Sequence, residues 1–110
     1  MKRLLAAAGL AAACTPVAAP ELPSARGLTL VPGQRGLAVS PTALEIGFGR
    51  AEAGAVAAAA RVQGRPAGRV EQLAGCTRYV WRDGLAMDFR EGAFVAWRTG
   101  DGRSGGNPCA

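Results

Sequence analysis

The stretch VWRDGLAMDFREGAFVAWR, from Val80 to Arg98, decides the fold. Apolar residues alternate along it, and two turn dipeptides, Asp83-Gly84 and Glu91-Gly92, interrupt the alternation. A Gly-containing dipeptide between alternating segments is a strong short-range signal for a β-hairpin. The stretch therefore predicts three short antiparallel strands joined by two tight turns.

Two-residue turns would set the register of this meander. Trp81 would then face Ala86, which in turn would face Trp97, and Asp88 would face Val95. Because successive side chains point to opposite faces of a strand, we expect a core face and a mixed face. The core face comprises Val80, Met87, Phe89, Phe94 and Ala96, and the mixed face comprises Trp81, Ala86, Asp88, Val95 and Trp97. A slip of one residue would exchange the two faces.

The indoles of Trp81 and Trp97 on the mixed face have two interpretations. In the first, the N-terminal strands or the C-terminal tail cover them. In the second, they form an exposed candidate interaction face together with Asp88, because indoles supply large contact areas. That face would dock a protein partner or line a cleft for sugar or peptidoglycan. For Asp88 itself we favour a cross-strand ion pair with Arg78, which would stabilise the sheet little at a surface.

The first 13 residues have the form of a secretory signal peptide. A basic start precedes ten residues of Leu, Ala and Gly, from Leu4 to Ala13. A run of this length is too short for a membrane span, which needs about 20 residues. The segment LAAAC, which ends at Cys14, resembles a bacterial lipobox, although Ala11 stands where such boxes usually have Leu. We expect Cys14 to be lipidated; ordinary cleavage after Ala13, which would leave Cys14 as a free thiol, is the alternative.

The chain has three cysteines, Cys14, Cys76 and Cys109. An odd cysteine is unusual in an exported protein. If Cys14 carries a lipid, Cys76 and Cys109 remain as a pair, and an oxidising compartment favours a disulfide between them. The bond would close a loop around the meander and stabilise the fold by about 3–4 kcal/mol. The chain has no His, and two thiolates alone rarely form a metal site, so we expect no metal.

Basic residues exceed acidic ones, with 13 Lys and Arg against eight Asp and Glu. Every basic residue after Arg3 is an arginine, and these arginines are scattered along the sequence. Nucleic-acid binding needs a basic stripe or patch, so we expect a solvated basic surface and no nucleic-acid partner. A tethered protein with this charge would be weakly attracted to anionic lipid headgroups.

The segments before the meander predict a tether, short strands and one helix. Residues 14–26 are rich in Pro and form the tether, and residues 27–110 form one small domain. Strands are expected at 28–31, 37–39 and 44–48, with a turn at Pro32-Gly33, and residues 65–75 form a loop or edge segment. The Ala-rich segment from Arg50 to Val62 predicts a helix that ends at Gly64. The fold class is therefore α+β, with a single Ala-rich helix packed on a small antiparallel sheet of four to six strands.

Three features carry a likeness to a known family: a helix that ends in Gly64-Arg65-Pro66, then Trp81, then a strand pair from Leu85 to Phe94 with a Phe-x-x-Gly turn. This order resembles small bacterial envelope lipoproteins of the SmpA/OmlA (BamE-like) type. In that family a helix ending in an LGxP turn precedes a strand pair whose turn reads FxxGxV. The family has a helical pair where this chain shows one helix. The resemblance implies a lipidated, non-catalytic envelope domain.

The absence of His removes the usual catalytic triads. Asp83 and Glu91 are turn residues, and we expect no catalytic site and no cofactor. The sequence predicts a periplasm-facing structural or protein-interaction module, with the membrane as partner through the lipid on Cys14 and an envelope protein as a further partner. The alternative is a soluble periplasmic or secreted protein that binds a glycan or small ligand through Trp81 and Trp97.

Overall fold

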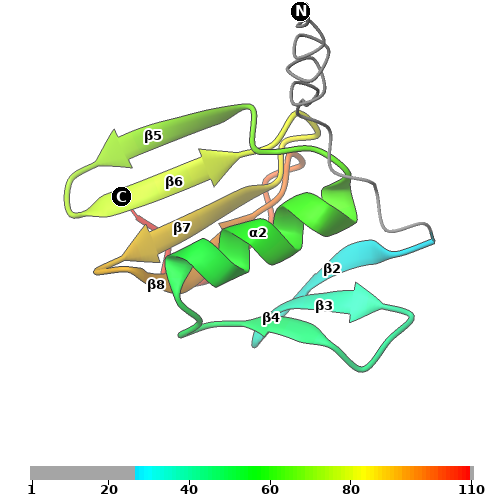
Figure 1. The fold of residues 1–110 in the computed structure, drawn as a ribbon. Helices are drawn as coiled ribbons and strands as arrows, with labels where there is room; N and C mark the ends of the chain where they lie inside the picture. The colour runs from blue at the N-terminus through cyan, green and yellow to red at the C-terminus, as the bar shows by residue number, and fades with distance from the viewer. Residues whose placement is uncertain (1–26, 110) are drawn as a thin grey trace, which may run out of the picture.

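One helix and two antiparallel sheets make up residues 27–109, the part of the chain that the computed structural model describes (Figure 1). The expected class, α+β, is therefore confirmed, but the strands form two sheets where one was expected. The predicted signal peptide, Cys14 and the predicted tether lie outside the described residues.

The smaller sheet has three strands in the order β2-β3-β4. These strands are β2 (Thr29–Gly33), β3 (Gly36–Ser40) and β4 (Glu45–Gly47). Gly33 pairs with Gly36, so the first hairpin turns at residues 34 and 35 and the expected turn at Pro32-Gly33 is wrong. The pattern of alternation also misplaced Leu44, which precedes β4 and is 67% exposed, whereas Ile46 is buried.

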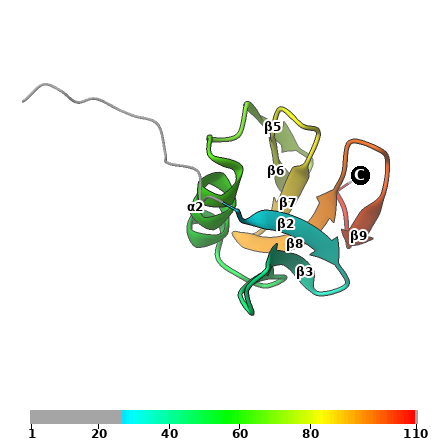
Figure 2. The same cartoon turned by 90° about the vertical axis from the view of Figure 1, so that its right-hand side faces the viewer.

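The helix α2 (Glu52–Gln63) ends as the sequence predicts. Gly64 adopts a left-handed conformation, with φ of 79°, and its N–H group donates to the carbonyl of Ala60. The fully buried positions are Ala55 and Ala59. Their small side chains let the helix approach both sheets, and α2 contacts β2 and β4 on one side and β8 on the other (Figures 1 and 2).

The larger sheet has five strands in the order of the sequence, β5 to β9. They are β5 (Arg69–Leu73), β6 (Cys76–Val80), β7 (Ala86–Arg90), β8 (Ala93–Arg98) and β9 (Ser104–Gly106). β5 is an edge strand that pairs with β6, which agrees with the edge segment predicted as one alternative for residues 65–75. Its charged side chains Arg69 and Glu71 disfavour pairing with another chain at this edge.

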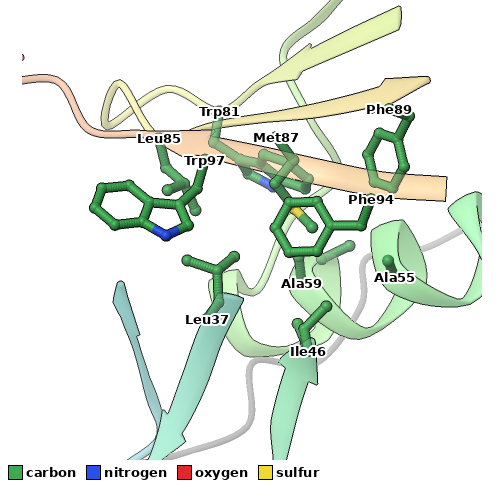
Figure 3. Close-up of a cluster of buried hydrophobic side chains, with 11 residues drawn as sticks. Leu37, Ile46, Ala55, Ala59, Trp81, Leu85, Met87, Phe89, Phe94 and Trp97 are labelled. Carbon is green, nitrogen blue, oxygen red and sulfur yellow. The ribbon is translucent and has the colours of Figure 1, made fainter. Parts of the chain in front are cut away.

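The hydrophobic core lies where the helix and the two sheets meet (Figure 3). Phe89 and Phe94 face each other across β7 and β8, with ring centroids 5.5 Å apart. The largest side chains with almost no exposed surface come from β3, β4, β7 and β8: Phe89, Phe94, Leu37, Ile46 and Met87. The core therefore joins the two sheets into one folded unit.

The first turn of the meander is wider than a two-residue turn. Val80 pairs with Ala86, and beyond them the N–H group of Trp81 donates to the carbonyl of Leu85, at 2.8 Å. Three residues, from Arg82 to Gly84, therefore form the turn. The Asp83 carboxylate accepts a hydrogen bond from the N–H group of Leu85, at 3.1 Å, which stabilises the longer loop. The predicted pairing of Trp81 with Ala86 is wrong, and the one-residue shift moves Trp81 to the opposite face.

The second turn is the two-residue turn that the sequence predicts, because Arg90 pairs with Ala93 and Phe89 with Phe94. Beyond that point β8 contains a bulge: Asp88 pairs with Ala96, so Val95 is an extra residue on β8. The bulge reverses the alternation of β8. The predicted pairs of Asp88 with Val95 and of Ala86 with Trp97 are therefore wrong.

Candidate functional site

Both tryptophans belong to the core, so the candidate interaction face is not exposed. Only 2% of Trp81 and 7% of Trp97 is accessible to solvent. The Trp81 indole N–H donates to the carbonyl of Arg65, at 2.9 Å, and the Trp97 indole N–H donates to the carbonyl of Gly33, at 2.8 Å. These bonds satisfy both indoles, as buried polar groups require. The wider turn places Trp81 on the core side of the sheet, and the bulge places Trp97 there (Figure 3).

Asp88 is also buried, in the cross-strand ion pair that the sequence predicts. Its side chain is 3% exposed, and Arg78 on the neighbouring strand donates to both carboxylate oxygens, at 2.7 and 3.0 Å. The hydrogen bond to Asp88 raises the pKa of Arg78 above its ordinary value. The pair is buried, so the expectation of a surface pair is wrong, and loss of either partner would leave a buried charge at a high free-energy cost. Asp88 is therefore not available to an external ligand.

The C-terminal tail crosses the outer face of the larger sheet, the face away from α2. Asn107 donates to the carbonyl of Val95, at 2.8 Å, and the N–H group of Cys109 donates to the Asp88 carboxylate, at 2.9 Å. A disulfide then joins Cys109 to Cys76 on β6, with the two Cα atoms 6.1 Å apart. The structure thus contains the disulfide expected from the cysteine count, and both cysteines are buried.

Four arginines lie together at one end of the larger sheet, although they are far apart in the sequence. Arg69 begins β5, Arg82 lies in the turn between β6 and β7, and Arg98 ends β8. Arg65 follows the C-terminal end of α2 and lines two surface hollows together with Arg82. We call Arg65, Arg69, Arg82 and Arg98 the arginine cluster. All four side chains belong to exposed residues.

The outer face of the sheet carries a shallow hollow of about 400 Å³ within this cluster. Arg69, Val80, Ala86 and Arg98 pair in one row across four strands, which places an arginine at each end of an apolar floor. Three strand spacings separate the two arginine Cα atoms by about 14 Å. Arg82 lines the hollow beside the turn, and Arg78, already paired with Asp88, also lines it. One carboxylate, that of Glu71, lies in the same lining and pairs with Arg69.

Sequence reasoning missed this cluster because it treated the arginines as scattered. The signal that joins Arg69 to Arg98 is their common row, and that row follows from the pairing of Val80 with Ala86. The two-residue turn that we expected pairs Val80 with Met87, and it would have removed the row. A cluster of guanidinium groups around an open hollow favours phosphate or carboxylate groups as ligands.

Other classes of site have less support in the described part of the chain. Residues 27–109 contain no group of three or more Cys, Asp and Glu side chains placed to hold a metal ion. Within the same residues, no helix is both long enough and apolar enough to cross a membrane. The hollow within the arginine cluster is the candidate binding surface of the described residues.

The chain matches no protein-family model, no curated protein and no solved structure. The likeness to envelope lipoproteins of the SmpA/OmlA type stays a prediction from the sequence.

Proposed function

We propose that this protein is a non-catalytic lipoprotein of the bacterial cell envelope, anchored by a lipid on Cys14 and facing the periplasm. Its folded part serves as a structural or protein-interaction module. The proposal combines the signal-like start of the sequence with the way in which the fold uses its cysteines.

The observation that carries the proposal is the buried disulfide between Cys76 and Cys109. A disulfide persists in an oxidising compartment outside the cytosol. The bond also accounts for two of the three cysteines and leaves Cys14, which follows the small residues Ala11 to Ala13. An exported protein with one remaining cysteine at that position fits acylation better than a free thiol.

The uses of the acidic side chains support a non-catalytic role. Asp88 pairs with Arg78 and holds the C-terminal tail. Glu52 accepts a hydrogen bond from the Tyr79 hydroxyl, at 2.6 Å, and Asp83 accepts one from the N–H group of Leu85. These carboxylates hold the fold together, and the burial of Trp81 and Trp97 removes the basis for the alternative, a glycan or small-ligand site.

The test is mass spectrometry of the protein extracted from membranes of the bacterium that produces it. We expect a chain that begins at Cys14, carries acyl groups on that residue and contains an intact Cys76–Cys109 bond. A Cys14→Ser variant is the matched control, and its chain should carry no acyl group. Recovery of the unmodified chain with Met1 intact and all thiols reduced would contradict the proposal.

A further inference from the structure

The arginine cluster lies at the same end of the molecule as Gly27 and Leu28, where the described chain begins. β5 and β7 begin at this end, and β6 and β8 finish there, because neighbouring strands are antiparallel. Leu28 lines a hollow with Asp83, Thr99 and Gly100, which are neighbours in sequence of Arg82 and Arg98. Figure 1 shows the start of β2 at the same side as the turn between β6 and β7.

The cations of this end are free to meet an external anion. Arg65, Arg82 and Arg98 are exposed, and within residues 27–109 none of the three lies within 4.0 Å of a carboxylate oxygen. Arg69 pairs with Glu71 at 2.7 Å, but its side chain is 66% exposed. Surface pairs of this kind are weak, so Arg69 can exchange its partner at little cost.

We propose that the arginine cluster binds the anionic phospholipid headgroups of the membrane that holds the lipid anchor. The direction of this surface rests on the proposed function: with a lipid on Cys14, the chain would enter the domain at the end where the arginine cluster lies. The tether of about 13 residues reaches at most about 45 Å, so the domain stays near the surface. Guanidinium groups suit the bilayer because their planar donors match the oxygens of a phosphate group.

Orientation is the consequence of this contact. A basic residue near an anionic membrane contributes to binding independently of the lipid chain, and two signals anchor a protein more stably than one. With the cluster on the membrane, the opposite end of the sheet, at the turn between β7 and β8, points away from the bilayer. An envelope partner would then approach from that end.

The test measures vesicle binding by flotation, using the chain that begins at residue 14 with Cys14→Ser, so that neither an acyl group nor the predicted signal peptide contributes. Vesicles of phosphatidylcholine alone report the contribution of other parts of the chain, and vesicles that also contain phosphatidylglycerol report the anionic headgroups. We expect binding to the anionic vesicles that weakens as salt is added. The triple variant Arg65→Gln/Arg82→Gln/Arg98→Gln should bind them about 100-fold more weakly.

The matched control removes the same charge elsewhere, by Arg35→Gln/Arg50→Gln/Arg90→Gln, and should bind as the parent chain does. Circular dichroism checks that each variant is folded, and the single change Arg82→Gln, in an exposed turn, gives a second measurement with an expected loss of about fivefold. Equal losses in both triple variants would overturn the proposal in favour of attraction by net charge. Equal binding to both kinds of vesicle would also overturn it.

The two proposals can fail separately. Vesicle binding uses a chain that cannot be acylated at residue 14, whereas mass spectrometry of the membrane extract reports acylation whether or not the arginines bind headgroups. An acylated Cys14 with no headgroup binding would leave the anchor and remove the membrane-facing surface. Capture of an acidic envelope protein by the cluster, with no vesicle binding, would assign the arginines to a protein partner and contradict the lipid proposal.

Discussion

Asp88 connects three segments through one carboxylate. It pairs with Arg78 on β6, and its Oδ2 atom also accepts the N–H group of Cys109 in the tail. Arg78 in turn donates to the carbonyl of Cys109, at 3.3 Å. A carboxylate that is 3% exposed needs these partners, because burial removes the water that would otherwise solvate its charge.

We predict that Asp88→Asn lowers the free energy of unfolding by about 2–4 kcal/mol. The amide keeps the size of the side chain, but it leaves the Arg78 guanidinium without its counter-charge in a largely buried position. Urea denaturation followed by circular dichroism measures the change. Asp101→Asn is the matched control, because Asp101 also pairs with an arginine, Arg103, but on the exposed surface. Equal urea midpoints for the two variants would show that the buried pair stabilises the fold no more than the exposed pair does.

A second residue-scale prediction concerns the only tyrosine of the chain, Tyr79. Its hydroxyl donates to the Glu52 carboxylate, and this bond raises the pKa of Tyr79 above its ordinary value. Because the folded state holds the proton more tightly, the bond stabilises the fold fully below the unfolded pKa of about 10, and this contribution is lost as pH rises through the folded pKa. Ultraviolet absorbance of the phenolate should therefore show a higher midpoint in the folded chain than in urea.

The Glu52→Gln variant separates this cause from burial. Removal of the carboxylate charge should lower the Tyr79 midpoint toward that of the denatured chain, while the fold persists. An unchanged midpoint in Glu52→Gln would assign the shift to burial, which is the second cause of the raised pKa.

At the scale of elements, the turns of the meander position both the core and the candidate surface. The turn at Glu91-Gly92 has positive φ at both residues, 53° and 79°, as a two-residue hairpin of this type requires. The carbonyl of Gly92 also accepts the N–H group of Glu52, the first residue of α2, at 2.8 Å. The helix has no side-chain cap at its N-terminus, so the hairpin turn supplies a partner for one of its free N–H groups.

We predict that Glu91→Asn raises the free energy of unfolding by about 0.5–1 kcal/mol. A glutamate pays a steric cost in the left-handed region, which Asn occupies more readily. The measurement is the urea midpoint, and Glu91→Ala is the control, because Ala removes the same charge without the local preference of Asn. If Ala and Asn stabilise equally, the charge of Glu91 and not its backbone conformation is the cause.

These elements also show which parts of the structure the sequence predicts. The helix, its end at Gly64 and the second turn follow from local residue types, and the cysteine pair follows from the cysteine count. The first turn does not, because Asp83-Gly84 and Glu91-Gly92 are alike in sequence, and the longer loop contains a hydrogen bond from the Leu85 N–H group to the Asp83 carboxylate. The alternation of apolar residues also fails to predict the bulge at Val95, because no residue type typical of a bulge marks its position.

The candidate site depends on the same two irregularities. Each one reverses the faces of a strand, so together they turn an expected tryptophan surface into core. The shift in β6 also aligns Val80 and Ala86 between Arg69 and Arg98. The arginine cluster could therefore be inferred only after the register was known.

At the scale of the whole molecule, a short chain buries little apolar surface, so its core alone stabilises the fold only modestly. The tail contributes by crossing β7 and joining β6 through the disulfide, with the ion pair of Asp88 and Arg78 beneath it. Gly105 allows the strand before the tail to lie against the Trp97 indole, because a Cβ atom at this position would lie 2.6 Å from the ring. Disulfide, ion pair and indole thus hold the C-terminal segment at three points.

We predict that the Cys76→Ser/Cys109→Ser variant is less stable than the parent chain by about 3–4 kcal/mol, because the bond closes a loop with a sequence separation of 33 residues. A small domain has a total stability of about 5–15 kcal/mol, so this loss is a large share of the whole. The free energy of unfolding of the parent chain, measured by urea denaturation, should fall by the same amount when a reducing agent is added, whereas that of the variant should not change. The hydrogen bond from Cys109 to Asp88 does not need the sulfur atoms, so the loss of both the bond and the Asp88 charge should be smaller than the sum of the two separate losses. Additive losses would show that the disulfide and the ion pair stabilise the tail independently.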